Sequence, residues 1–229
     1  MNRAKPLRLV VLGANGRTGI LVVGAALERG MEVTAVVRSA DKRPDIRHDR
    51  LMAAVGDPCD KDFLREVLKG QDAVISTLGG KRPTKAATAV SYRSAAALVE
   101  AARQTSVNRV LVTSTALLFP EQTPLGHVLR LVVPNTVRSA TSMENILKVS
   151  GLIWTSARPG FLVDRDDAAY RVHPSKLPAG AMSVSRRALA AFLLDAIDDP
   201  QAHCAALGLS NTPMAKASLP AETPAASAP

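Results

Sequence analysis

Short runs of apolar, often β-branched residues recur along the chain and alternate with longer stretches whose apolar residues follow helical spacing. The short runs predict strands at residues 9–12, 31–37, 50–57, 72–77, 109–115, 151–158 and 205–210. The longer stretches predict helices at residues 20–30, 60–69, 88–104, 141–149 and 183–197. Segments 116–137 and 163–182 are expected to be loops, the first with a short apolar helix at 128–133. This alternation predicts the α/β class, with a doubly wound parallel sheet and helices on both faces.

The first apolar run ends in three glycines, Gly13, Gly16 and Gly19, spaced three residues apart. A helix and a second short strand follow, so that about thirty residues form one β-α-β unit. Glycines at a strand-to-helix turn let a phosphate approach the backbone, and free N–H groups at a helix N-terminus carry partial positive charge. The motif in this context predicts a Rossmann-type sheet that binds the pyrophosphate of a dinucleotide. A glycine loop that only makes a turn is the alternative.

The length of 229 residues and the hydrophobic content of 47% suit a single well-filled domain. We expect this domain to span residues 1–211, with a substrate crevice built from its late loops, and residues 212–229, rich in Ala, Pro, Ser and Thr, to form a disordered tail. Cys59 and Cys204 lie far apart, which argues against a zinc site or a disulfide framework and indicates two ordinary buried thiols and no metal. Without a secretory signal or a membrane-spanning stretch, a cytoplasmic protein with no membrane partner is expected.

The formal net charge of +9 is compatible with an anionic ligand, an acidic surface or nucleic acid. The basic residues are scattered, with one local cluster at Lys42, Arg43, Arg47 and Arg50. No helix-turn-helix, zinc-finger or aromatic RNA-binding motif accompanies them. We therefore expect the charge to attract a phosphorylated cofactor, with nucleic-acid binding as the lesser alternative.

The residue that closes the second strand distinguishes NAD from NADP. A carboxylate there hydrogen-bonds the ribose hydroxyls of NAD, whereas a cation suits the 2′-phosphate of NADP. This chain has Arg38 and Ser39 at that point, and no carboxylate before Asp41. Because a guanidinium matches a phosphate in charge and geometry, NADP(H) is predicted as the preferred cofactor over NAD(H).

Several blocks together resemble the atypical short-chain dehydrogenase/reductases, the NAD(P)H-binding group that includes NmrA-like proteins and the flavin reductase known as biliverdin reductase B. The matching blocks are residues 11–19, 36–39, 56–57, 112–115, 150–155 and 158–162, and the resemblance covers about residues 7 to 210. It implies an NAD(P)H-binding fold and leaves the substrate open.

The resemblance also implies roles for individual residues. The pyrophosphate would lie against the glycine turn, formed by Gly13, Asn15, Gly16, Arg17, Thr18 and Gly19. Arg38 and Ser39 would meet the 2′-phosphate, Asp57 the adenine, and Leu78 and Gly79 the cofactor ribose. Further along, Ser114 and Thr115 would lie near the nicotinamide, and Pro159, Gly160 and Phe161 would cover it. For Ser114, a strand-end hydroxyl that only satisfies the backbone is an equal alternative.

The chain departs from the larger short-chain dehydrogenase family at the catalytic Tyr-x-x-x-Lys pair. Tyr92 is followed four residues later by Ala96, and Tyr170 by Pro174. The helix expected to carry the pair has no tyrosine, so alcohol–ketone chemistry is not favoured. His127 is a candidate acid, although a lone histidine is more often a surface or packing residue. Glu144 could face the crevice, although an exposed helix carboxylate is the usual explanation.

Three functions remain in competition. The leading one is an NADPH-dependent oxidoreductase that transfers hydride to a small conjugated acceptor, such as a flavin or quinone, without a Tyr-Lys pair. The alternative is a non-catalytic NADP(H)-sensing regulator of the NmrA-like type, with a protein partner. The third is a nucleic-acid-associated protein, which the charge alone favours.

Overall fold

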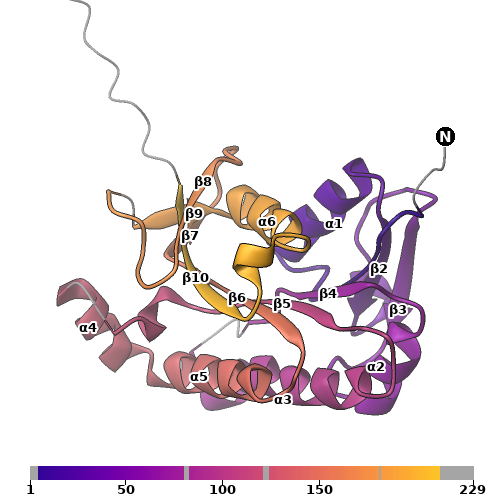
Figure 1. The fold of residues 1–229 in the computed structure, drawn as a ribbon, viewed down its shortest axis with the longest axis horizontal. Coiled ribbons are helices and arrows are strands. Elements are labelled where there is room, and N and C mark those ends of the chain that lie inside the picture. The colour runs from indigo at the N-terminus through magenta and orange to yellow at the C-terminus, as the bar shows by residue number, and fades with distance from the viewer. Residues whose placement is uncertain (1–4, 80–82, 121–123, 181, 212–229) are drawn as a thin grey trace, which may run out of the picture.

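Eight strands form one sheet in the order β3-β2-β1-β4-β5-β6-β10-β8 (Figure 1). The structure is a computed structural model that describes residues 5–79, 83–120, 124–180 and 182–211. The strands of this sheet are β1 (Arg8–Leu12), β2 (Glu32–Val37), β3 (Leu51–Val55), β4 (Ala73–Ser76), β5 (Arg109–Thr113), β6 (Ile153–Pro159), β8 (Tyr170–His173) and β10 (Ala205–Asn211). All neighbours pair in parallel except β8 and β10, which are antiparallel. The predicted doubly wound α/β fold is therefore confirmed, with one antiparallel edge strand.

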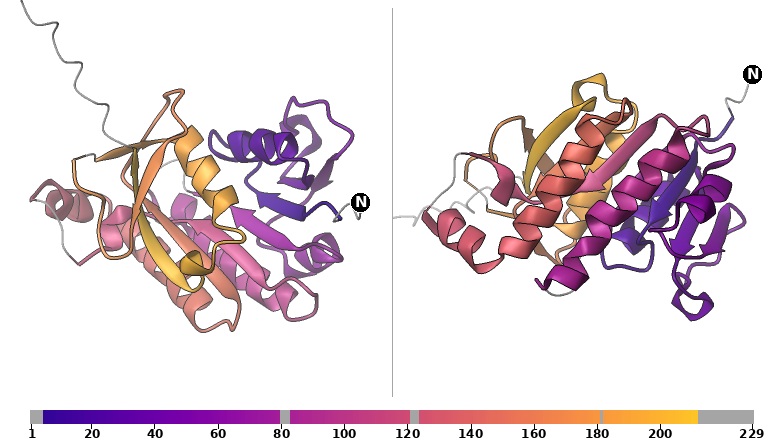
Figure 2. Two further views of the ribbon diagram at one scale, coloured as in Figure 1. Left: turned by 45° about the horizontal axis from the view of Figure 1, so that its top comes forward. Right: turned by 90° about the horizontal axis from the view of Figure 1, so that it is seen from below.

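Two layers of helices cover this sheet (Figures 1 and 2). One face carries α1 (Gly19–Glu28) and α6 (Arg186–Asp195), and the other carries α2 (Lys61–Leu68), α3 (Lys85–Ala102) and α5 (Pro134–Lys148). Successive β1 side chains alternate between the two cores: Leu9 and Val11 pack with α1 and α6, while Val10 and Leu12 pack with α2 and α3. Burial on both faces explains why the strand reads as an uninterrupted apolar run.

The late segments contain more regular structure than their sequence predicts. Strand β7 (Phe161–Val163) pairs in parallel with β9 (Ser183–Ser185) in a separate two-stranded sheet, and β8 lies between them in the chain. The expected loop at 163–182 and the expected helix start at 183 are thus wrong. The helix begins at Arg186, because Ser185 accepts a hydrogen bond from the N–H of Ala188 and caps it.

The segment after β5 is also more helical than expected. A short 3-10 helix (Ala116–Leu118) precedes α4 (Pro124–Val132), and α5 begins at Pro134, well before the predicted residue 141. Proline is compatible with the first helical turn, since the N–H that it lacks would have no partner there. The predicted tail at 212–229 lies outside the described residues.

A buried arginine, Arg109, lies at the amino end of β5 and links it to neighbouring elements. Its Nε donates to the carbonyl of Ile197 at 2.9 Å, and its guanidinium also donates to Ile153 O at 3.0 Å and Thr155 Oγ1 at 2.7 Å. Burial lowers the pKa of Arg109 to about 10. This guanidinium joins β5, β6 and the end of α6, so it serves the fold and lies away from the carboxyl ends where ligands bind.

Candidate active site

The glycine turn after β1 has the geometry that its sequence predicts. Gly13 adopts φ +78°, and the N–H of Gly16 donates to the Gly13 carbonyl at 2.8 Å. A Cβ at Gly19 would lie only 2.1 Å from that same carbonyl oxygen and 2.9 Å from Thr77 Oγ1. The first turn of α1 thus approaches the end of β1 more closely than any side chain would allow.

The N-terminus of α1 is left without a side-chain cap. Thr18 makes no capping hydrogen bond, and the first turn contains no acidic residue. By contrast, α2, α3 and α6 are capped by Asp60, Thr84 and Ser185. The N–H groups and partial positive charge at this end of α1 are available to an anion.

The end of β4 lies directly beside the glycine turn. Thr77 Oγ1 donates to the Leu12 carbonyl at 3.2 Å, and Gly79 faces open space. The strand order reverses between β1 and β4, the place where doubly wound sheets bind ligands. Within the glycine turn itself, the exposed Arg17 forms an ion pair with Asp164, with 3.3 Å between Arg17 Nη1 and Asp164 Oδ2.

The ends of β2 and β3 carry the residues predicted for the adenosine half. Arg38 and Asp57 are both exposed, and Asp57 Oδ1 accepts the N–H of Cys59 at 2.9 Å. Burial and the Asp57 charge raise the pKa of Cys59, while the charges of Arg93 and Arg38 oppose this rise. Arg93, on α3, therefore lies close enough to Cys59 to act electrostatically on the same corner as Arg38, and no local pattern in the sequence indicates this.

Arg50, the last residue of the basic cluster in the sequence, donates to the Gly30 carbonyl at 2.7 Å, at the amino end of β2. The prediction for the two cysteines is wrong. The cysteines are not ordinary buried thiols, because Cys59 is only part-buried and Cys204 is exposed. The described residues contain no group of three His, Cys, Asp or Glu side chains that could hold a metal ion.

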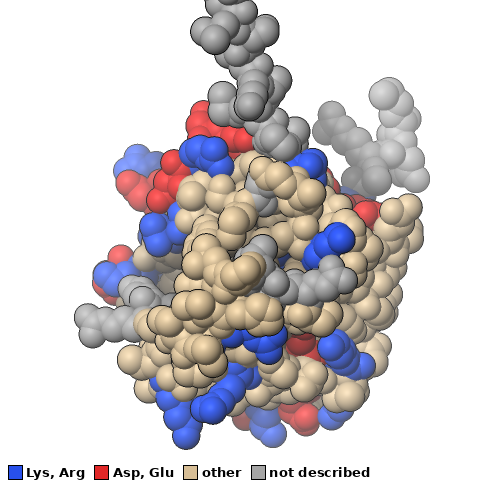
Figure 3. Space-filling model, turned by 90° about the vertical axis from the view of Figure 1, so that its left-hand side faces the viewer, with Lys and Arg blue, Asp and Glu red and all other residues tan. Residues whose placement is uncertain are grey.

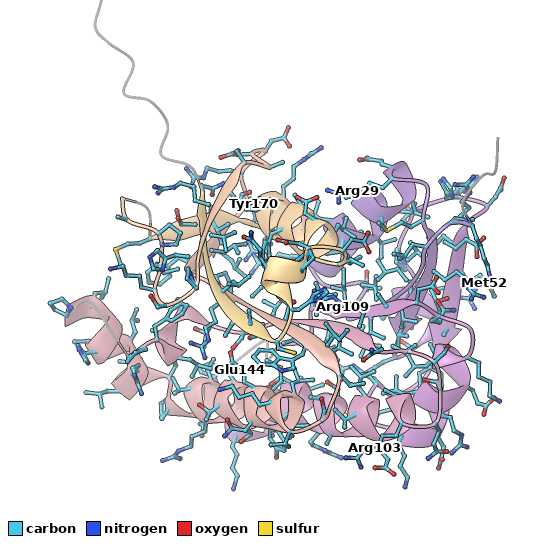
Figure 4. All side chains as sticks on the ribbon, in the orientation of Figure 1. Arg29, Met52, Arg103, Arg109, Glu144 and Tyr170 are labelled. Carbon is cyan, nitrogen blue, oxygen red and sulfur yellow. The ribbon has the colours of Figure 1, made fainter. Side chains whose placement is uncertain are left out.

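Glu144 is the main site residue that sequence reasoning misplaced (Figure 4). Its side chain, expected on the surface of α5, is only 1% exposed. Its Oε1 accepts from Ser114 Oγ at 2.8 Å, from Ser156 Oγ at 2.7 Å and from Arg158 Nε at 3.0 Å. Its Oε2 accepts from Arg158 Nη2 at 2.6 Å, and the Arg158 guanidinium lies 4.7 Å from the centre of the Phe119 ring. Glu144, Ser114, Ser156 and Arg158 join α5, β5 and β6, and we call these four residues the Glu144 network.

Opposing effects act on the pKa of Glu144. Burial alone would raise it, but the hydrogen bonds from Arg158 and Ser156, with the Arg158 charge, outweigh burial and hold the pKa below its ordinary value. Glu144 is thus ionised and accepts hydrogen bonds only. The Ser114 proton points to Glu144, so the remaining lone pairs of Ser114 Oγ are free to accept a bond from elsewhere.

A small hollow of about 90 Å³ opens beside Ser114, between the ends of β4 and β5 and the helices α3 and α5. We call it the hydroxyl hollow, because most of its lining side chains carry hydroxyl groups: Thr88, Ser91, Thr113, Ser114, Thr115, Thr136 and Ser139. Leu78 and Gly79 also line it, as do Ala140 and Met143 of α5. Among the described residues, the buried Thr113 Oγ1 has no hydrogen-bond partner.

A larger cavity of about 650 Å³ adjoins it and shares Thr115. We call it the apolar cavity, since its walls are mainly aliphatic and aromatic. One wall is formed by Pro159, Gly160 and Phe161, a second by α4, and the far wall by residues 176–180 and Met182. The backbone of the far wall packs directly against two glycines. A Cβ at Gly208 would lie 2.0 Å from Lys176 O, and one at Gly160 would lie 2.1 Å from Met182 O.

The remaining candidates lie outside both spaces. His127 is exposed on α4 and lines neither the hydroxyl hollow nor the apolar cavity. Tyr170 donates to Asp195 Oδ2 at 2.6 Å, and burial with this bond raises its pKa. Tyr92 packs against the core beneath α3. The α5 residues at the hydroxyl hollow are Thr136, Ser139, Ala140 and Met143.

Comparison with known proteins agrees with this geometry. The model of the NAD(P)H-binding family matches residues 13–200. A 3-diazoavenalumate denitrifying reductase from a Streptomyces species is 31% identical over 198 residues, covering 75% of this chain and 64% of the relative. The chain spans less than two thirds of the length of the curated relatives that it matches.

Solved structures share the fold at low identity. A short-chain dehydrogenase/reductase from Veillonella parvula in complex with NADP has a TM-score of 0.76 at 20% identity, over 92% of this chain and 96% of that chain. ChuY, an anaerobillin reductase from Escherichia coli O157:H7, has a TM-score of 0.74 at 21% identity, over 92% of this chain and all of that chain (100%). The NAD(P)H-binding resemblance predicted from sequence is confirmed, and the chain belongs to the NAD(P)H-binding family.

Proposed function

We propose that the chain is an NADPH-dependent reductase of a small, largely apolar conjugated acceptor. One observation carries the proposal: the apolar cavity and the hydroxyl hollow share Thr115 as a lining residue, beyond the carboxyl ends of β4, β5 and β6. The hydroxyl hollow suits the polar carboxamide of a nicotinamide, and the apolar cavity suits an acceptor stacked beside it. At about 650 Å³, the cavity has the volume of a typical small-molecule site.

The chain's own groups fit a dinucleotide along the remaining sheet edge. The uncapped N-terminus of α1 and the space kept open by Gly13 and Gly19 would receive the pyrophosphate. Asn15, Gly16, Arg17 and Thr18 would surround it, while Leu78 and Gly79 would follow the ribose and Asp57 would meet the adenine. Arg38 and Ser39, with Arg93 nearby, would hold a 2′-phosphate.

The preference for NADPH gives a first prediction. Replacing Arg38 with alanine should weaken NADPH binding by roughly 10- to 100-fold, the range for one hydrogen bond to a charged group, and leave NADH binding nearly unchanged. Calorimetric titration with each cofactor measures both. Arg103→Ala removes another exposed cation at the far end of α3 and should change neither affinity. Equal losses for both cofactors in the Arg38 variant would contradict the assignment.

Bound NADPH supplies the hydride, so the protein has to position an acceptor and exclude water. The hydride goes to the conjugated acceptor, whose π-system spreads the added charge, and one proton from solvent completes acceptor + NADPH + H⁺ → reduced acceptor + NADP⁺. No Asp, Glu or His is among the described residues that line the apolar cavity. The α5 residues that line the hydroxyl hollow and lie four residues apart are Thr136 with Ala140 and Ser139 with Met143, which supports a reaction without a Tyr-Lys pair.

Ser114 is proposed as the positioning residue for the nicotinamide. Because its proton points to Glu144, its oxygen would accept a hydrogen bond from the carboxamide NH₂ and set the ring beside Thr115. Pro159, Gly160 and Phe161 would cover the ring from the apolar cavity. We assign His127 no role in the proposed reaction, because its exposed side chain lines neither the apolar cavity nor the hydroxyl hollow.

A second prediction separates this role from a purely structural one. Ser114→Ala should lower kcat at least about tenfold, the effect of losing one hydrogen bond that orients a reacting group, with a smaller change in the KM for NADPH. Ser156→Ala is the matched control, because Ser156 donates to the same Glu144 oxygen but lines neither space. Steady-state kinetics of both variants test the role. Equal losses of kcat in the two variants would show that Ser114 has only a structural role.

The overall assignment is tested by NADPH oxidation with flavin and quinone acceptors. Turnover that saturates with acceptor is expected. Tight NADPH binding without turnover of any acceptor would favour the alternative, a non-catalytic NADP(H)-sensing regulator. The lack of an Asp, Glu, His or Tyr among the described lining residues is compatible with that alternative as well. A protein partner whose binding depends on the redox state of the cofactor would establish it.

A further inference from the structure

Helix α4 is apolar on two opposite sides, and among the described residues one of them faces the apolar cavity. Gly126 and Leu129 line that cavity, as does Val133 directly after the helix. On the outer side, Leu125 is 48% exposed, Val128 56%, Leu131 81% and Val132 66%. A surface helix normally shows polar residues outward, and one that is apolar all round is normally covered. The outer side of α4 therefore needs a partner.

The exposed apolar side chains continue from α4 to the mouth of the apolar cavity. Phe161 and Met182 line that cavity and are themselves 50% and 45% exposed. Together with Leu125, Val128, Leu131 and Val132 they make up most of the large exposed hydrophobic residues in the described chain, and we call these six residues the α4 face. Contiguous exposed apolar area of this kind marks an interaction site.

Two segments around the α4 face carry positive charge and no acid. Residues 124–143 include Arg130 and Arg138, and residues 169–180 include Arg171 and Lys176, while Asp164, Asp166 and Asp167 follow Phe161 outside these two segments. Figure 3 views this end of the molecule: the central surface is uncharged, and Lys and Arg side chains, with some Asp and Glu among them, lie below it and at its sides. The net charge of +9 has the same sign.

We propose that the α4 face docks on the surface of an anionic lipid bilayer. Apolar side chains that enter the headgroup region and basic residues around them are the two elements of interfacial membrane binding. No described helix is long and apolar enough to cross a membrane, and interfacial docking requires none. The sequence-based expectation of no membrane partner rested on the lack of a spanning stretch, which does not bear on this mode.

The charge pattern favours lipid over a second copy of the chain. A two-fold dimer would bring the α4 face against itself, because such an interface uses the same patch on both subunits. Arg130 and Arg138 would then approach their own copies, and residues 124–143 and 169–180 contain no carboxylate to pair with them. Anionic headgroups supply the missing charge. Docking would also turn the mouth of the apolar cavity toward the lipid, where an apolar acceptor of the proposed reductase concentrates.

Co-sedimentation of the full chain with vesicles tests the docking without substrate or turnover. Vesicles of equal parts phosphatidylcholine and phosphatidylglycerol should bind the protein, while vesicles of phosphatidylcholine alone should bind it weakly. Leu131→Glu should lower the partition constant at least about tenfold, because one leucine would no longer enter the lipid and a negative charge would face it. Val149→Glu changes an equally exposed valine at the far end of α5 and should bind like wild type.

Leu131 lines neither the apolar cavity nor the hydroxyl hollow, so NADPH affinity should stay unchanged in this variant and report its correct folding. Loss of vesicle binding with intact NADPH binding supports the docking face. No binding of the wild-type protein to anionic vesicles would overturn the proposal, as would equal binding of the two glutamate variants. A dimer in sedimentation experiments that Leu131→Glu dissociates, without vesicle binding, would overturn it too and assign the α4 face to a second copy.

Discussion

Replacing Gly19 with alanine is expected to abolish measurable NADPH binding and to destabilise the fold. The new Cβ would lie 2.1 Å from Gly13 O, 2.8 Å from Gly13 C and 2.9 Å from Thr77 Oγ1, and two of these atoms belong to the backbone. The first turn of α1 must therefore shift away from β1 and take its N–H groups with it. Crowding of this kind costs about 1–3 kcal/mol of stability. Loss of several backbone donors should raise the NADPH Kd at least about 100-fold.

The same helix offers a control for this variant. Gly24 lies in the middle of α1, and a methyl group added there would meet nothing within 4 Å. Gly24→Ala should therefore stabilise the protein by about 0.5–1 kcal/mol, because alanine has the higher helix propensity, and leave the NADPH Kd unchanged. Urea unfolding and calorimetric titration measure the two effects. Wild-type affinity in the Gly19 variant would show that the turn does not hold the pyrophosphate.

Replacing Glu144 with alanine should have the largest effect on stability. Arg158 would keep its charge at a largely buried position, where Glu144 is its only ion-pair partner among the described residues. Removing one member of a buried ion pair costs about 3–5 kcal/mol. The variant should unfold at much lower urea, and any folded fraction should lose turnover because the Ser114 hydroxyl is no longer oriented.

A double variant separates the charge from the packing. Glu144→Leu combined with Arg158→Met removes both charges and keeps most of the volume, so it should be more stable than Glu144→Ala alone. Turnover should stay low in both, since Ser114 lacks its partner in each. If the double variant were less stable than Glu144→Ala, the unpaired charge of Arg158 would not be the cause of the destabilisation. The proposed energetic coupling between Glu144 and Arg158 would then be wrong.

The lowered pKa of Glu144 also makes stability depend on pH. The ordinary value of 4.5 applies to the unfolded chain, and the folded value lies below it. The stabilisation from the ionised carboxylate is then complete above about pH 4.5 and is lost as pH falls through the folded pKa. Comparing acid unfolding of wild type with Glu144→Gln measures this: the stability gap between them should narrow on the acid side.

Much of the fold could be predicted because its strands are buried on both faces. The run at β1 and the glycines after it are local signals, and the turn they predict depends on neighbouring residues only. Strand β8 escaped prediction because it is short and only partly buried, so no apolar run marks it. Its place follows from pairing with β10, which lies more than thirty residues later in the chain.

The Glu144 network could not be predicted for a similar reason. A glutamate on an amphipathic helix is normally exposed, and the sequence around Glu144 fits that expectation. Its partners lie on two strands, and the pairing of Ser156 with Val112 brings the end of β6 beside the end of β5. Arg93 is another such case, since only the packing of α3 against Cys59, whose Sγ faces the Val90 carbonyl, lets Arg93 and Arg38 act on the same thiol. Tertiary packing, rather than local pattern, creates both.

The far wall of the apolar cavity rests on two positions that have no side chain, Gly160 and Gly208. A methyl at Gly208 would push the wall at residues 176–180 outward, while the glycine turn follows β1 and would be untouched. A relative with alanine at this position would thus have a reshaped cavity through one codon. Under the proposed function, acceptor range could then evolve through Gly208 separately from coenzyme affinity.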